Sequence, residues 1–185
     1  MTDEHVSILD GNTFVVSDRR GDIEASATDP TGFFSFDTRF LSRWVLTIDE
    51  ERLTSLSTDD MHYFESRFFL VPGMGTVYID AKLTVIRQRV VESGFREHLT
   101  LLNHADEPVE VRVRLDAGSD FADLFEVKDA LQKKGDLGTR VENGCLVLAY
   151  VRDTFRRTTT ISSTEPAQID ERGLGFTVRI EGHGS

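Results

Sequence analysis

Apolar and polar positions alternate with a period of two along much of this chain. Residues 109–115 (VEVRVRL) place Val or Leu at each odd position and a charged residue at each even one. Because successive side chains of a strand point to opposite faces, this pattern predicts a strand with one buried and one solvated face. Residues 82–91 and 95–102 share the β bias, and residues 103–108 hold the Asn, Asp and Pro typical of turns. We therefore predict a three-stranded antiparallel meander over residues 82–115, in which 95–102 and 109–115 pair as a hairpin.

A second hairpin is predicted at Asn143-Gly144, which joins residues 139–142 to 145–151. Asn-Gly is the preferred type I′ turn, since both central residues need a positive φ. Further strands are expected at 158–162, 168–170 and 176–180, with Gly173-Leu174-Gly175 turning between the last two.

The first third of the chain is less regular. Residues 13–17 predict a short strand, and residues 39–48 and 62–71 predict longer ones with apolar residues on both faces. A strand that is apolar on both sides is covered on both sides. The sheet is therefore either central here or meets another domain.

One helix is a candidate, over residues 121–134. Phe121, Leu124, Phe125 and Lys128 recur at helical spacing, and Asp120 precedes them as a possible cap. The chain is thus expected to be all-β, an antiparallel two-sheet β-sandwich with at most one or two short helices, forming a single domain over residues 1–185.

The net charge and the cysteine content limit which cellular compartment and which kinds of binding partner are expected. The formal net charge of −11 disfavours nucleic acid and anionic membranes but is compatible with a neutral ligand. Cys145 is the single cysteine, so it forms no internal disulfide, and its apolar surroundings predict a buried, inert thiol. No apolar run reaches the roughly 18 residues of a membrane span, and the polar residues 1–5 do not resemble a secretory signal. We expect a cytoplasmic protein.

The sequence carries no readable catalytic, cofactor or metal site. The motifs HExxH, GxxxxGK[ST], GxSxG and GxGxxG are absent, and the five histidines are scattered. With 32 acidic residues, a pair of carboxylates has no diagnostic value. Arg20-Gly21-Asp22 is interpreted as a tight turn in which Gly21 supplies the positive φ and Asp22 binds nearby amides.

The most informative feature is a mixture of Asp, Arg and aromatic residues in the segments 11–23, 32–44, 65–70 and 120–127. Buried charges are costly unless they are paired, so these segments are expected to form ion-paired clusters. Such a network lies either inside the fold or against a partner. Partners for Asp37, Arg39 and Arg43 are expected among Asp18, Asp22, Asp120 and Asp123. The candidate interface or cleft-wall residues are Asp37, Arg39, Arg43, Trp44, Arg67, Asp120 and Asp123.

Taken together and in order, these segments resemble the N-terminal domain of bacterial glycogen-debranching enzymes of the amylo-α-1,6-glucosidase type. The residues that carry the resemblance are 12–14 (NTF), 16–23 (VSDRRGDI), 37–44 (DTRFLSRW), 66–69 (SRFF), Leu102-Asn103 before Pro108-Val109, and 120–127 (DFADLFEV).

The resemblance implies a β-supersandwich followed by an (α/α)6 toroid that holds the acid and base carboxylates. The 185 residues show no run of amphipathic helices, so by resemblance the chain is the accessory domain alone and its catalytic pair lies beyond Ser185. The implied partners are the toroid of the same polypeptide and a branched α-glucan. The isolated chain is expected not to hydrolyse glucans.

Other roles remain open at this point. An independent carbohydrate-binding module needs an exposed aromatic platform, for which Trp44 and Tyr63 are the candidates, although both lie in dense apolar stretches more typical of a core. A purely structural interaction domain is the other alternative. A homodimer would be one way to cover a second apolar face.

Overall fold

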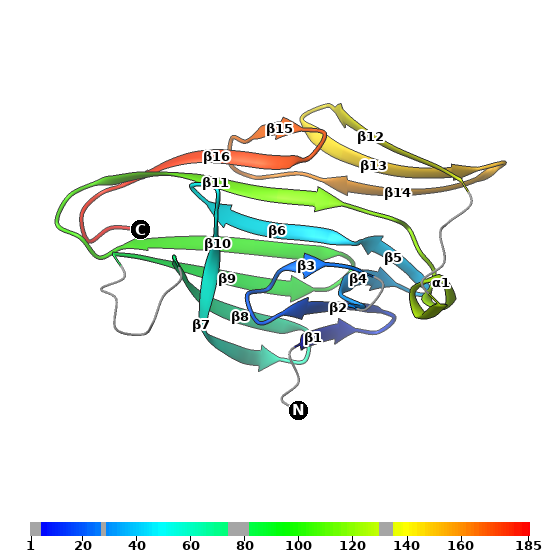
Figure 1. Cartoon of the computed structure of the whole chain (residues 1–185), viewed down its shortest axis with the longest axis horizontal. Helices are drawn as coiled ribbons and strands as arrows, with labels where there is room; N and C mark the ends of the chain where they lie inside the picture. The colour runs from blue at the N-terminus through cyan, green and yellow to red at the C-terminus, as the bar shows by residue number, and fades with distance from the viewer. Residues whose placement is uncertain (1–4, 27–28, 74–81, 130–134) are drawn as a thin grey trace.

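The computed structural model describes residues 5–26, 29–73, 82–129 and 135–185, which form antiparallel β-strands and one short helix (Figure 1). The predicted all-β class is confirmed. The strands are β1 His5–Asp10, β2 Thr13–Asp18, β3 Ile23–Glu24, β4 Gly32–Ser35, β5 Thr38–Leu41, β6 Arg43–Ile48, β7 Glu51–His62, β8 Glu65–Pro72, β9 Leu83–Val91, β10 Phe95–Asn103, β11 Val109–Gly118, β12 Asp136–Glu142, β13 Cys145–Arg152, β14 Phe155–Ile161, β15 Gln168–Asp170 and β16 Gly173–Ile180, and the helix is α1 Leu124–Asp129.

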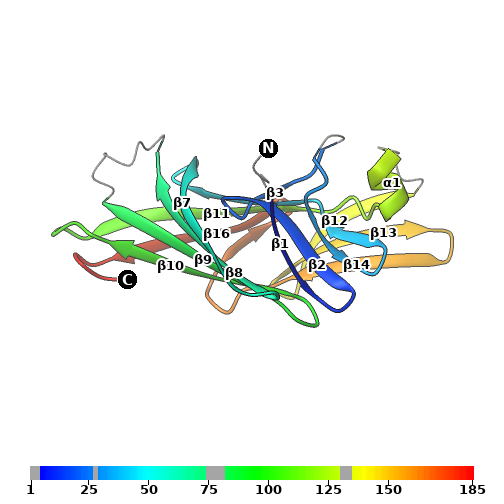
Figure 2. The ribbon, with the colours of Figure 1, turned by 90° about the horizontal axis from the view of Figure 1, so that it is seen from below.

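The two layers of the fold are largely two halves of one curled sheet. A nine-stranded sheet runs in the order β10-β9-β8-β7-β6-β11-β16-β15, with β3 added to β6. Strand β7 pairs with β6 at its start and with β8 for the rest, and its register shifts at Ser55/Ser57 and Asp59/His62. Such bulges bend a strand and increase its twist. The sheet curls at β7, and Figure 2 shows β8–β10 lying in front of β11 and β16.

Smaller sheets complete the domain. Strands β1, β2, β4 and β5 form a four-stranded sheet, and β12, β13 and β14 form a three-stranded one. The Thr159 hydroxyl on β14 donates a hydrogen bond to the Phe40 carbonyl on β5, which joins their edges. The expected two-sheet sandwich is therefore built from three hydrogen-bonded sheets.

The predicted hairpin between residues 95–102 and 109–115 is wrong. Both strands exist, but β10 pairs with β9, whereas β11 lies between β6 and β16. The connection crosses from one layer to the other. The side-chain amide of Asn103 donates to the carbonyl oxygens of Glu107, Ile180 and Glu181, and these hydrogen bonds stabilise the crossover. Alternation identifies which face of a strand is buried, but it does not identify the neighbouring strand.

Other local predictions hold better. Asn143 and Gly144 have φ values of 51° and 71°, and the β12–β13 hairpin forms around them as expected. The β15–β16 pair is confirmed, although its turn lies at residues 171–172 and Gly173 already starts β16. The predicted strand 39–48 divides at Ser42 into β5 and β6, and the predicted strand 62–71 is β8, which starts at Glu65.

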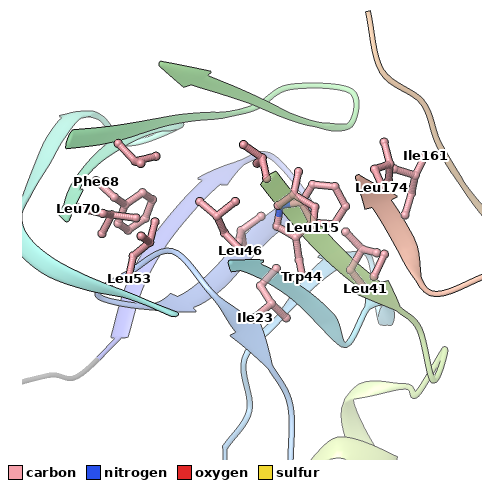
Figure 3. Packing of buried hydrophobic residues seen from close by; sticks show 14 of the residues in the cluster. Ile23, Leu41, Trp44, Leu46, Leu53, Phe68, Leu70, Leu115, Ile161 and Leu174 are labelled. Carbon is pink, nitrogen blue, oxygen red and sulfur yellow. The ribbon is translucent and has the colours of Figure 1, made fainter. Parts of the chain in front are cut away.

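The two-sided apolar pattern of the early strands is satisfied within the chain. Trp44 and Val45 are neighbours on β6 and point to opposite faces, yet they are only 6% and 2% exposed. Val71 on β8 is also buried. Figure 3 shows Trp44, Leu46, Leu70 and other side chains of the core cluster packed between the layers. These strands therefore do not present a second apolar face to a partner.

The helix and the cysteine differ from expectation. The helix α1 starts at Leu124, and its cap is Asp123, whose carboxylate accepts from the Phe125 and Glu126 amides. Asp120 is not the cap because its carboxylate pairs with Arg39. Residues 130–134 of the predicted helix lie outside the described residues. Cys145 is half-buried rather than buried, because it is the first residue of β13.

No helix in the described ranges is long and apolar enough to cross a membrane.

Candidate functional site

Four charged residues form an ion cluster inside the domain: Asp22, Arg87, Arg89 and Glu97. Their side chains are at most 3% exposed. Arg87 donates to Asp22 Oδ1 at 2.7 Å and to Glu97 Oε1 at 3.0 Å, and Arg89 donates to Glu97 Oε2 at 2.6 Å. The two positive and two negative charges cancel. We call this group the buried ion cluster.

The alternation of β9 puts the two arginines inside. Leu83, Val85 and Val91 are buried, and Arg87 and Arg89 share their parity on the strand. The guanidinium carbon of Arg89 lies 5.2 Å from the centre of the Phe68 ring and 4.9 Å from that of Phe95, so it is held between aromatic faces. Neither arginine was a sequence candidate. The signal was nevertheless present, since two arginines occupy inward positions of an otherwise apolar alternation.

The buried ion cluster connects the Arg20-Gly21-Asp22 turn to the nine-stranded sheet. Asp22 accepts a hydrogen bond from the Leu46 amide on β6 as well as from Arg87, and Arg89 donates to the Gly21 carbonyl. The predicted turn with positive φ at Gly21 is confirmed, at 80°. However, Asp18, and not Asp22, binds the amides of the turn, at Arg20 and Asp22.

Electrostatics keep Glu97 ionised. Burial by itself raises the pKa of Glu97, but the charges of Arg87 and Arg89 and the Trp44 N–H favour the carboxylate, so the pKa lies below its ordinary value. Burial lowers the pKa of both arginines. Contacts with two carboxylates outweigh this for Arg87, whose pKa is raised, whereas Arg89 contacts one carboxylate and faces Arg87, so its pKa is lowered. Both guanidinium groups stay charged at neutral pH.

Carboxylates that are buried, and whose charges are balanced by arginines, do not act as a general acid and base on a polymer. A glycosidase pair has to flank a bond in an open cleft, and its acid needs a raised pKa. Asp22 and Glu97 instead form structural ion pairs with Arg87 and Arg89. Among the described residues no group of three or more His, Cys, Asp or Glu side chains is arranged to hold a metal ion.

A second site forms where two of the sequence segments meet, Phe36–Arg39 and Asp120–Phe125, which we call the α1 corner. Arg39 makes a two-pronged contact with Asp120, at 3.1 Å through Nε and 2.5 Å through Nη2. Its backbone amide donates to the Ala122 carbonyl, and the Leu124 amide donates to the Asp37 carbonyl. Segments far apart in sequence are thus fixed against each other.

The corner exposes an unusual amount of aromatic surface. Phe125 is 76% exposed, Phe36 is 71% exposed and Leu124 is 43% exposed. Phe36 also has a φ of 53°, a left-handed conformation that is unfavourable for a bulky residue. Beneath them, Phe121 is fully buried and packs against Phe40 and Tyr150. Packed aromatic rings form the interior of the corner, and its most exposed side chains, those of Phe36, Leu124 and Phe125, are apolar.

The remaining sequence candidates are spread over the domain. The expected coupling of Arg39 to Asp120 is present, but Arg43 pairs with Glu24 and Asp116, outside the expected set. The exposed Asp37 accepts from its neighbour Thr38. The Trp44 N–H donates to Glu97, and Arg67 lies half-buried on β8 opposite Asp59. Tyr63, expected in the core, is instead 69% exposed at the β7–β8 turn.

Replacing Arg39 by alanine is expected to destabilise the domain by about 2–3 kcal/mol, below the roughly 3–5 kcal/mol typical of a fully buried pair because Asp120 is 39% exposed and regains water. Loss of the aliphatic part of the Arg39 side chain also leaves a gap beside Gly32, because Arg39 packs so closely on Gly32 that no side chain would fit there. Urea denaturation followed by circular dichroism measures the change. Arg43→Ala is the matched control, since its pairs are exposed and should contribute less than about 1 kcal/mol. Equal midpoints for both variants would contradict this account.

The described residues thus form an all-β domain with a buried ion cluster and an exposed apolar corner. The comparison with protein families identifies the kind of domain. The chain belongs to the family of N-terminal domains of some glycogen debranching enzymes, whose model matches residues 8–185. No curated protein matches the chain significantly.

Proposed function

We propose that residues 1–185 form one non-catalytic accessory domain that packs on the catalytic toroid of a glycogen debranching enzyme through the α1 corner. Membership of a family of N-terminal domains implies a larger enzyme. The observation that carries the proposal is the exposed surface of Phe36, Leu124 and Phe125. Aromatic side chains on a rigid support are typical of the central part of a protein interface.

The chemistry of the corner indicates what its partner looks like. Acidic groups border the apolar side chains, including the exposed Asp37 and the half-buried Asp120 and Asp123. A matching surface on the toroid would have an apolar centre and a basic rim. The candidates Asp37, Arg39, Asp120 and Asp123 would then shape or border the contact, whereas Arg43, Trp44 and Arg67 lie elsewhere. We also propose a cytoplasmic location, which the lone Cys145 supports because a single cysteine forms no internal disulfide.

The backbone strain at Phe36 gives a selective test. Asparagine tolerates a positive φ and has no ring to expose, so Phe36→Asn is expected to leave the isolated domain as stable as before or to stabilise it by up to about 1 kcal/mol. The same change is expected to weaken binding to the toroid, because it removes apolar contact area. Thermal melting and a binding titration measure the two effects separately. A lower melting temperature together with unchanged binding would oppose the proposal.

A toroid supplied in trans is the appropriate partner for this titration. Because the toroid is then a separate chain, its binding requires no assumption about a connecting segment between the C-terminus and the corner, which lie on different sides of the domain (Figure 1). Self-association of the isolated domain through the same corner is the competing result, and light scattering at two concentrations detects it. If the α1 corner bound neither the toroid nor a second copy of the domain, the proposed interface would be wrong.

A further inference from the structure

We propose that the outer edge of β12 pairs with the same edge of a second copy of the chain, so that two three-stranded sheets join into one. Among the described strands, β12 has only β13 beside it and forms the end of its sheet (Figure 1). An uncovered strand edge presents unpaired backbone N–H and C=O groups to any strand that fits. The proposal is separate from the docking of the toroid, because β12 contains no residue of the α1 corner.

The register of the β12–β13 hairpin decides which backbone groups face outward. Glu142 and Cys145 close the two-residue turn as a hydrogen-bonded pair, and every second pair after them is also hydrogen-bonded. The residues between them on β12, Leu137, Thr139 and Val141, therefore direct their N–H and C=O groups away from β13. All 7 residues of β12 are exposed, and the strand contains no proline, lysine or bulge of the kind that protects an edge.

The charges of β12 favour a second copy as the partner, in one particular register. With a two-fold axis at Gly138, Asp136 of each copy lies opposite Arg140 of the other. In the same register Leu137 lies opposite Thr139, and each such pair exchanges both hydrogen bonds because the two residues face outward. Asp136 and Arg140 then form the closer, non-hydrogen-bonded pairs, in which opposite charges stabilise a sheet.

The neighbouring registers are disfavoured by like charges. A two-fold axis at Thr139 places Asp136 opposite Glu142, and an axis at Arg140 places two arginines opposite each other. Within one chain, Arg140 contacts Glu142 at 2.8 Å, but the two side chains are 54% and 52% exposed, and such surface pairs contribute little. The guanidinium group has enough N–H donors to bind a second carboxylate at the same time.

Gly138 provides independent support for the close approach of another backbone. Its φ is outside the left-handed region, its pairing with β13 is regular, and a Cβ atom added there would meet no described atom within 4 Å. Neither the backbone conformation nor the packing of the domain therefore calls for glycine at this position. A glycine inside a strand often marks a place where another backbone comes close, and here it lies on the two-fold axis between the two ion pairs.

Sedimentation of the whole chain between about 10 μM and about 1 mM tests the proposal, and a weak dimer that dissociates on dilution is expected for a contact of this size. Asp136→Arg and Arg140→Asp should each weaken the dimer about tenfold, because each places like charges opposite each other. An equimolar mixture of these two variants should dimerise like the unaltered chain, because opposite charges again face each other between unlike copies.

Thr139→Pro tests the backbone pairing. It removes an outward-facing N–H that β13 does not use, so it should abolish the dimer and leave the melting temperature nearly unchanged. Arg179→Asp is the matched control for Arg140→Asp, since Arg179 on β16 also forms an exposed ion pair with the glutamate two residues further on. This control should dimerise like the unaltered chain.

A chain that stays monomeric at about 1 mM would overturn the proposal. A dimer that persists in Thr139→Pro, or a mixture of the two charge variants that associates no better than either variant alone, would overturn it as well. Phe125→Asp should leave this dimer unchanged, and loss of the dimer in Phe125→Asp but not in Thr139→Pro would assign self-association to the α1 corner instead.

Discussion

Replacing Glu97 by alanine is expected to cost about 3–5 kcal/mol of folding free energy, a large part of the roughly 5–15 kcal/mol that stabilises a domain. The change leaves Arg87 and Arg89 without their shared carboxylate in a site where both are fully buried. It also removes the acceptor of the Trp44 N–H. The expected result is a marked fall in the urea midpoint, or a chain that is unfolded at ambient temperature.

Glu92→Ala is the control for this variant, because Glu92 pairs with Arg96 at the surface, where the side chains are 58% and 77% exposed. Its midpoint should stay close to that of the unaltered domain. A Glu97 variant as stable as the Glu92 variant would mean that the buried arginines find other partners, which contradicts the role of the cluster.

The same cluster predicts a dependence on pH. The folded-state pKa of Glu97 lies below the value of about 4.3 expected for an unfolded chain. The ionised Glu97 therefore contributes its full stabilisation at pH values above this unfolded-chain pKa, and the stabilisation is lost as the pH falls through the folded-state pKa. Glu97→Gln should flatten the acid side of the stability profile. Some slope should remain, because Asp170 has a pKa lowered to about 2, mainly by its hydrogen bond from Arg114.

The second large effect is expected at the surface. Phe125→Asp should reduce affinity for the toroid by 2 kcal/mol or more, about thirtyfold, as is typical for a central aromatic residue of an interface. The stability of the isolated domain should hardly change, because the ring is 76% exposed. Surface plasmon resonance with the toroid immobilised measures the affinity, and thermal melting measures the stability.

The control for this variant is Leu137→Asp, which replaces a 56% exposed apolar residue on β12. It should leave binding unchanged if the α1 corner alone forms the contact. Equal losses for Phe125→Asp and Leu137→Asp would indicate a contact spread over several faces and would contradict the assignment.

The sequence is informative where structure depends on neighbouring residues. The alternation of residues 109–115 and the Asn143-Gly144 dipeptide fix a strand and a hairpin through local geometry, and both predictions hold. The pairing of residues 95–102 with 109–115 was wrong because partner choice is a long-range property. It depends on the crossover held by Asn103 and on β16, which follows about sixty residues after β11 begins.

The same distinction applies to the sites. The coupling of Arg39 to Asp120 could be predicted because both lie in segments that combine charge with aromatic residues. The arginines of β9 were overlooked because charged residues in a strand usually indicate the solvated face. Their inward parity with Val85 and Val91 was visible in the sequence, but the carboxylates that neutralise them come from other strands and turns. Exposure of Phe36 and Phe125 depends on packing and could not be predicted from sequence.

The most direct test of the central claim is hydrogen–deuterium exchange on the domain alone and in complex with the toroid. Amide exchange at residues 35–39 and 122–128 is expected to be slower in the complex. The β7–β8 turn, where Tyr63 is exposed, should be unchanged. Slower exchange at the β7–β8 turn with unchanged exchange at the α1 corner would contradict the account.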